Sequence, residues 1–107
     1  MANNFKNAKL DLSTNSVTTL YTAPSATTAV FKSLLVSNDQ SSGSTITVTI
    51  TDSASAVFSV YNVKSIGANT TEELLTEALV VTEGEILKVT AADADRLHVI
   101  GSFLEIT

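Results

Sequence analysis

The residue types that carry acid–base, nucleophilic or metal chemistry are few in this sequence and widely spaced. The single histidine, His98, lies between Leu97 and Val99, and no cysteine or second histidine accompanies it. A nucleophile–base pair or a zinc site needs at least two such groups. No serine lies in a Gly-x-Ser-x-Gly turn, which marks many serine hydrolases. We therefore expect His98 to be a surface or interface residue of a protein that is not an enzyme.

Clustered carboxylates have plainer explanations than catalysis or metal binding. The glutamates concerned are Glu72, Glu73, Glu77, Glu83 and Glu85. Paired carboxylates serve glycosidases, but sugar clefts are usually lined with aromatic side chains, which make up only 6% of this chain. Asp93-Ala94-Asp95 offers oxygen ligands for Ca²⁺ without the glycine and terminal glutamate of an EF-hand loop. We expect solvated turns here, with no catalytic residue, cofactor or metal.

The charge of the chain argues against nucleic acid as a partner. Its net charge is −5, and no two of its six basic residues are adjacent. Phosphate binding needs clustered Lys and Arg. The N-terminal residues lack the apolar stretch of a secretory signal, and no run approaches the roughly 20 apolar residues of a membrane span. We expect a soluble protein, made in a cytoplasm, that binds neither nucleic acid nor membrane.

The composition predicts one domain made of β-strands. A chain of 107 residues is too short for two separate cores, and its 44% hydrophobic content is enough for one. Threonine occurs 16 times and serine 13 times. Threonine is β-branched and fits a pleated sheet better than a helix.

Short β-type runs alternate with turn clusters from Ser16 onward, at the spacing typical of a sandwich or barrel. We expect strands at 17–21, 28–38, 45–51, 57–66, 86–91 and 96–106. Within 45–51 every even position is apolar and every odd position is threonine, which predicts one buried and one solvated face.

Two segments do not follow this pattern. Residues 1–15 are polar and rich in asparagine, and we interpret them as an N-terminal arm preceding a sandwich domain at 16–107. Residues 70–81 are ambiguous. Thr70 and Glu73 fit a helix capping box and are followed by leucines at helical spacing, so a helix and a strand remain equally open.

Several expected strands are apolar on both sides, more than a two-layer sandwich requires. In 30–36, Val30, Leu34 and Val36 share one predicted face, and Phe31 and Leu35 the other. In the last strand the two predicted faces hold Leu97, Val99 and Phe103 on one side and Ile100, Leu104 and Ile106 on the other. These second faces are covered by the arm or by the 70–81 segment, or they are scattered exposed residues of the ordinary kind, or they meet copies of the same domain. We favour the copies. The predicted interface residues are Phe5, Leu10, Phe31, Leu35, Ile100 and Leu104.

The chain resembles small virion proteins of tailed bacteriophages from Leu20 to its end. The similarity is carried by Leu20-Tyr21-Thr22-Ala23-Pro24 and by the strand 29–38 that ends in Ser37-Asn38. Residues 79–89 are similar to the family's apolar strand entering a Glu-x-Gly-Asp turn, with Glu85 where Asp is usual, and Phe103-Leu104-Glu105-Ile106 resembles the ending. The match covers about 85 of the 107 residues and leaves out the arm.

This resemblance implies a jelly-roll β-sandwich of about eight strands, with 70–81 as strand and bend instead of helix. It also implies a homo-oligomeric capsid decoration (cement) protein, with a trimer favoured and the major capsid protein or other virion proteins as partners. The alternative is a neck, tail or fibre component, or a receptor- or carbohydrate-binding module, for which Tyr21 and Tyr61 are the available aromatics. In each case the expected location is the virion.

Overall fold

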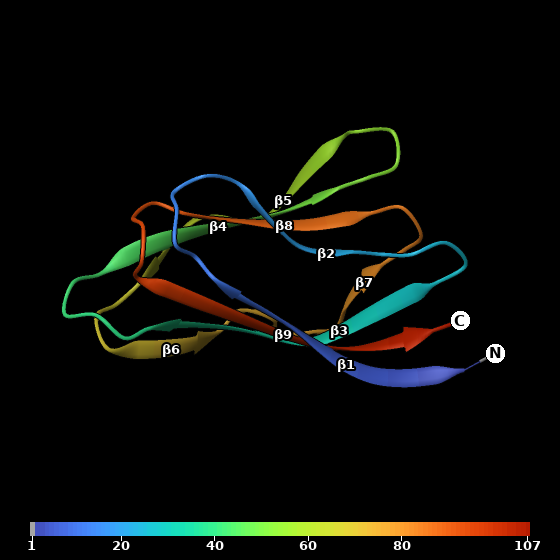
Figure 1. The fold of residues 1–107 in the computed structure, drawn as a ribbon, viewed down its shortest axis with the longest axis horizontal. Coiled ribbons are helices and arrows are strands. Elements are labelled where there is room, and N and C mark those ends of the chain that lie inside the picture. Colours follow the sequence, from blue (N-terminus) through green and yellow to red (C-terminus); the bar gives the residue numbers. More distant parts are fainter. Residues whose placement is uncertain (1) are drawn as a thin grey trace.

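The chain folds as two antiparallel β-sheets packed face to face, and the computed structural model describes residues 2–107 (Figure 1). The strands are β1 (Asn3–Asp11), β2 (Thr18–Thr22), β3 (Thr28–Asn38), β4 (Ser44–Thr51), β5 (Val57–Ile66), β6 (Thr70–Glu73), β7 (Leu79–Val81), β8 (Ile86–Ala91) and β9 (Leu97–Ile106). Among residues 2–107 there is no helix of the length and hydropathy needed to cross a membrane.

The strand order is that of a jelly roll. The first sheet has the order β1-β9-β3-β6, with β7 also paired to β3, and the second sheet has the order β2-β8-β4-β5. If β6 and β7 are counted as one interrupted strand, this is the two-sheet arrangement of an eight-stranded jelly roll. The all-β, jelly-roll prediction is therefore confirmed, with nine strands in place of about eight.

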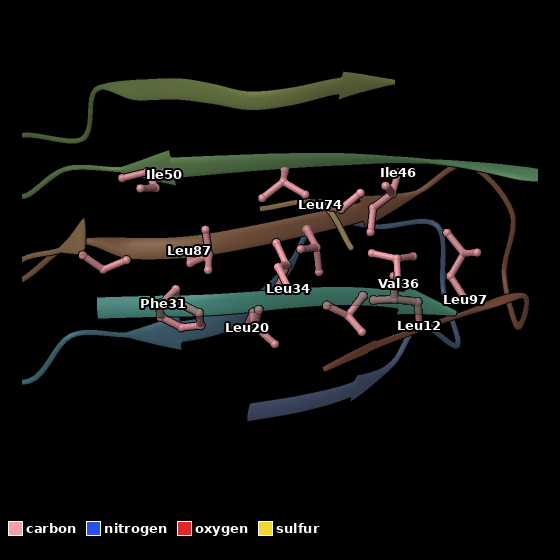
Figure 2. Close-up of a cluster of buried hydrophobic side chains, with 14 of the residues drawn as sticks. Leu12, Leu20, Phe31, Leu34, Val36, Ile46, Ile50, Leu74, Leu87 and Leu97 are labelled. Atoms are coloured by element: carbon pink, nitrogen blue, oxygen red, sulfur yellow. The ribbon is translucent and has the colours of Figure 1, made fainter. Parts of the chain in front are cut away.

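The core lies between the two sheets and follows the predicted alternation most clearly in β4. Ile46, Val48 and Ile50 are buried, and the threonines at 45, 47 and 49 lie on the partly exposed side. Figure 2 shows Leu34 and Val36 of β3 pointing toward the opposite sheet, and Phe31 belongs to the same buried cluster. The largest fully buried side chains are Phe31, Leu12, Leu34, Ile46, Ile66, Leu74, Leu87, Leu97, Val36, Val48, Val81 and Val89.

The segment expected to be an arm, 1–15, contains β1. This strand is an edge strand of the first sheet and pairs with β9 in unbroken register from Asn3 opposite Ile106 to Asp11 opposite His98. Most of its side chains are exposed, whereas Leu12, directly after it, is fully buried. Backbone pairing with β9 holds this polar segment in place. The pattern of apolar residues, from which strands are predicted, carries no information about such backbone pairing.

Residues 70–81 form no helix. β6 and β7 pair with the two halves of β3, and between them Leu74 enters the core and donates its N–H to the Leu34 carbonyl at 2.9 Å. Glu73, which the capping-box pattern assigns to a helix start, instead accepts hydrogen bonds from the Ser33 hydroxyl and from the Leu34 N–H. The strand and bend implied by the family resemblance are what the structure shows.

A β-bulge in β3 reverses the predicted orientation of Phe31. Opposite β9, the register shifts between Phe31 and Ser33, so Lys32 is one residue in excess. Because successive side chains alternate in a strand, an extra residue exchanges the two faces on one side of it. Phe31 therefore lies on the same inner face as Leu34 and Val36, with none of its surface exposed. Its prediction as an interface residue is wrong.

Candidate protein interface

A continuous apolar row crosses the outer face of the first sheet. Phe5 of β1 lies opposite Leu104 of β9, Leu104 lies opposite Val30 of β3, and Val30 lies opposite Val80 of β7. Residues directly opposite in a sheet share a face, so four neighbouring strands place these side chains side by side. Phe5 is 80% exposed and Val80 is 49% exposed.

Three more apolar residues extend this row. Ile100 of β9 lies opposite Leu35 of β3, and Ile106 of β9 lies opposite Thr28. Ile100 and Ile106 point to the same outer face as Leu104, and Leu35 shares that face with Ile100. Ile100 is 38% exposed, and Leu35 and Ile106 are partly exposed. We call the whole set the outer apolar face: Phe5, Val30, Leu35, Val80, Ile100, Leu104 and Ile106.

The outer face of the second sheet has a different chemistry. There Thr47 of β4 lies opposite Thr90 of β8, and Lys88 lies between Thr49 and Thr19. Hydroxyl and ammonium groups are well solvated, so the outer face of the second sheet can remain exposed to solvent. The outer apolar face of the first sheet is the more favourable surface for binding another protein. The domain thus has two unlike outer surfaces.

The structure places four of the six predicted interface residues together on the outer apolar face: Phe5, Leu35, Ile100 and Leu104. Phe31 is in the core. Leu10 lies opposite the buried Val99, so it faces inward and packs against the core. Leu10 therefore does not belong to this surface.

Sequence reasoning missed Val30 and Val80 as members of this surface, and it placed Ile106 on the face of Ile100 and Leu104 without including it in the predicted interface. Val30 was assigned to the face of Leu34 because the bulge at Lys32 has no signature in the apolar pattern. Val80 had a usable signal, since Leu79-Val80-Val81 is apolar at three consecutive positions and a strand cannot turn all three inward.

A second group of exposed apolar side chains lies on β5, the edge strand of the second sheet. Val57, Phe58 and Val63 are 63%, 57% and 59% exposed. The backbone register of β5 against β4 shifts twice, and Val63 has a φ of 52°, in the left-handed region that β-branched residues rarely adopt. Bulges and twist of this kind make an edge strand a poor template for another strand.

The groups considered for chemistry lie apart from one another or have structural partners. His98 lies on the outer side of β9, with its Nε2 3.4 Å from Asp11 Oδ1 and its Nδ1 3.9 Å from Asp39 Oδ2. Asp93 accepts a hydrogen bond from the Ser44 hydroxyl at 3.0 Å and pairs with Arg96 at 3.3 Å. Within residues 2–107, no three His, Asp or Glu side chains are grouped closely enough to hold a metal ion.

Glu73 has a structural role at the break between β6 and β7. Besides the Ser33 and Leu34 contacts, its carboxylate accepts the Leu75 N–H at 3.1 Å. Partial burial tends to raise the pKa of Glu73, but hydrogen bonds from Ser33 and from the backbone of Leu34, Leu75 and Leu74 outweigh it and lower the pKa. The carboxylate therefore ties the bulge of β3 to the bend after β6.

No protein-family model matches the chain, and no curated protein is significantly similar to it in sequence. Among solved structures, the fold is similar to that of a chain in the structure of infectious bursal disease virus, Gx strain. The TM-score is 0.52 at 13% identity, covering 95% of this chain and 33% of that chain. At this identity the likeness is one of fold, and the present chain spans about a third of the length of that viral chain.

Two further structures show weaker likeness. A chain in the structure of the same virus, Gt strain, has a TM-score of 0.48 at 12% identity, covering 98% of this chain and 30% of that chain. A pentameric capsid protein isolated from metagenomic phage sequences has a TM-score of 0.43 at 17% identity, covering 94% of this chain and 61% of that chain.

Proposed function

We propose that this chain is a non-enzymatic structural protein of a virus particle, and specifically a homo-oligomeric decoration protein that binds and stabilises a capsid shell. The observation that carries the proposal is the row Phe5–Leu104–Val30–Val80 on the first sheet. The jelly-roll fold, shared with a chain of a virus structure, is consistent with this role.

The outer apolar face has the chemistry of a surface that another protein covers. Monomeric soluble proteins rarely expose large contiguous apolar patches, and burying a leucine, isoleucine or phenylalanine contributes roughly 1.5 to 3 kcal/mol. Lys9 of β1 and Glu73 of β6 lie opposite Ile100 and Leu35, at one end of this face, so the row Phe5–Leu104–Val30–Val80 is where copies of a chain with net charge −5 would meet. A trimer is the oligomer that we favour.

The proposal is tested by changing two residues of the outer apolar face. Leu35→Ser with Leu104→Ser should leave the domain folded, since both side chains point away from the core, and should shift the oligomer toward monomer in sedimentation equilibrium. The matched control is Thr47→Ser with Thr90→Ser on the outer face of the second sheet, which should not change assembly. An oligomer unchanged by the leucine substitutions would refute the interface.

We also propose that residues 1–15 contribute to attachment to the shell. β1 supplies Phe5 to the outer apolar face and exposes most of its side chains. Phe5→Ser changes an exposed side chain and keeps both the β1–β9 pairing and the buried Leu12, so it should weaken binding to purified shells without lowering the midpoint of thermal unfolding. Equal binding of this variant and the wild-type chain in a co-sedimentation assay would refute this role.

A carbohydrate-binding role finds less support. The two tyrosines that a sugar site would use have partners within the domain: Tyr21 donates its hydroxyl to Glu105, and Tyr61 donates to the Leu74 carbonyl. A position in the neck, tail or fibre is distinguished by copy number. Quantitative mass spectrometry of particles should find a number that scales with the capsid lattice, whereas a single ring of copies would contradict decoration.

A further inference from the structure

A buried carboxylate on β9 connects three strands. Glu105 faces inward, and its side chain is only 8% exposed. It accepts a hydrogen bond from the Tyr21 hydroxyl of β2 at 2.6 Å and pairs with the Lys6 ammonium of β1 at 2.7 Å. Tyr21 is held in turn by Phe103, whose ring centroid lies 4.6 Å from its own.

The rest of β1 gives the strand little side-chain attachment to the sandwich. Of its nine residues only Ala8 and Leu10 are partly buried, and the exposed Asp11 makes a pair with His98. Backbone hydrogen bonds between β1 and β9 can form whichever residues are paired, so they do not by themselves select a register. Lys6 helps to select it together with Leu10 and Leu12, because a shift by one residue would turn its ammonium away from Glu105 and the leucines away from the core.

We propose that Lys6, Glu105 and Tyr21 form a latch that holds β1 on β9 while Glu105 is ionised and releases β1 when Glu105 is protonated. Buried ion pairs stabilise folds weakly compared with apolar contacts, and their best-attested uses are registry and switching. This inference rests on the contacts of Glu105 alone and is independent of the proposed virion role. Release would leave one edge of β9 open to a strand from another source.

The sign of the pH dependence follows from the partners of Glu105. The Lys6 contact first, and the Tyr21 hydrogen bond second, lower the pKa of Glu105 below its ordinary value of 4.5, against the opposing effect of burial. A carboxyl group with a lowered pKa stabilises the folded arrangement above its ordinary pKa, and this contribution is lost as pH falls through the folded value. The latch is therefore closed at neutral pH and opens in acid.

Lys6 and Tyr21 are the ionisable groups that shift the pKa of Glu105, and Lys32 of β3 lines the same hollow as Lys6 and Phe103. From β3, the residue opposite Glu105 is Ala29, which does not ionise, and from β1 the residue opposite is Asn4. Burial and the Glu105 contact raise the pKa of Tyr21, so its hydroxyl remains a hydrogen-bond donor across the range tested.

Hydrogen–deuterium exchange on the full-length chain tests the latch. In the wild-type protein, protection factors of β1 amides should fall as pH drops below 4.5, while those of β4 and β8 persist. Glu105→Gln should reduce β1 protection already at neutral pH by roughly tenfold or more, because it removes a charge-assisted contact. It should also abolish the pH dependence of β1 protection.

Lys6→Met is the second variant and should also loosen β1 selectively, which covers the case in which Glu105→Gln unfolds the whole domain. Lys9→Met is its matched control, because Lys9 lies opposite Ile100 on the outer face of the same strand. Equal β1 protection in Lys6→Met and Lys9→Met would overturn the proposal. So would a wild-type β1 whose protection does not change between neutral and acid pH.

Discussion

Gly101 lies on the inner face of β9, beneath the aromatic ring of Phe31. A methyl group added at Gly101 would lie 2.8 Å from Phe31 Cε2, closer than packed carbon atoms approach. The ring has little room to move, since it stacks on Phe103 with centroids 4.6 Å apart and meets Tyr21 edge-on at 5.4 Å. Glycine is needed here for close approach and not for an unusual φ.

We predict that Gly101→Ala lowers the free energy of unfolding by about 1 to 3 kcal/mol, the usual cost of overpacking a core. Gly67→Ala is the matched control, because its nearest new contact is Thr70 Oγ1 at an ordinary 3.5 Å, and it should change stability by less than about 0.5 kcal/mol. Urea denaturation measures both. Equal stability of the two variants would show that the Phe31 ring yields easily.

Individual residues also show where sequence reasoning succeeded. The alternation in 45–51 predicted the buried face of β4, and the double apolar character of 97–106 correctly separated Leu97 and Val99 from Ile100 and Leu104. These strands alternate without interruption on the inner face, so period and burial agree. Phe31 was assigned to the wrong face because the β-bulge is a feature of the backbone, and the positions of apolar residues in the sequence do not indicate it.

At the scale of elements, the bulge of β3 lies level with the break between β6 and β7. Phe31 pairs with Leu79 of β7 on one side of the bulge, and Leu35 pairs with Glu73 of β6 on the other. The bulge in β3 therefore lies at the point along the sheet where its partner strand is interrupted between β6 and β7. The pairing spans about forty residues of sequence, which explains why local patterns in 70–81 could not distinguish helix from strand.

We predict that deleting Lys32 is tolerated. Without this residue, Phe31, Ser33 and Leu34 would alternate regularly, in, out and in, and the pairs with β9 would be kept. Deleting Leu35, another outward residue of β3, should abolish cooperative thermal unfolding, because either Leu34 or Val36 must then leave the core. A Lys32 deletion that is as damaging as the Leu35 deletion would mean that the bulge itself is required.

At the scale of the whole molecule, two carboxylates with lowered pKa values make stability depend on pH. Glu73 and Glu105 both titrate below their ordinary value of 4.5 in the folded protein. The unfolded chain therefore takes up protons first, and the free energy of unfolding falls as pH drops through this range.

We predict that stability measured by urea denaturation is nearly constant from about pH 7 to about pH 5 and declines below that. The double variant Glu73→Gln with Glu105→Gln should be less stable at neutral pH and should show a shallower decline in acid. Glu77→Gln is the control, as an exposed glutamate in the bend between β6 and β7. A decline in the double variant as steep as in the wild type would place the responsible groups elsewhere.

β9 is the final strand in sequence but lies between β1 and β3 in space. During translation, the first sheet therefore lacks its middle strand until residues 97–106 have left the ribosome, and β1 has nothing to pair with before then. Ile100, Leu104 and Ile106 reach the outer apolar face only at that moment. Until β9 pairs with β3, one edge of β3 is unpaired, and partly made chains are therefore at their most prone to faulty association.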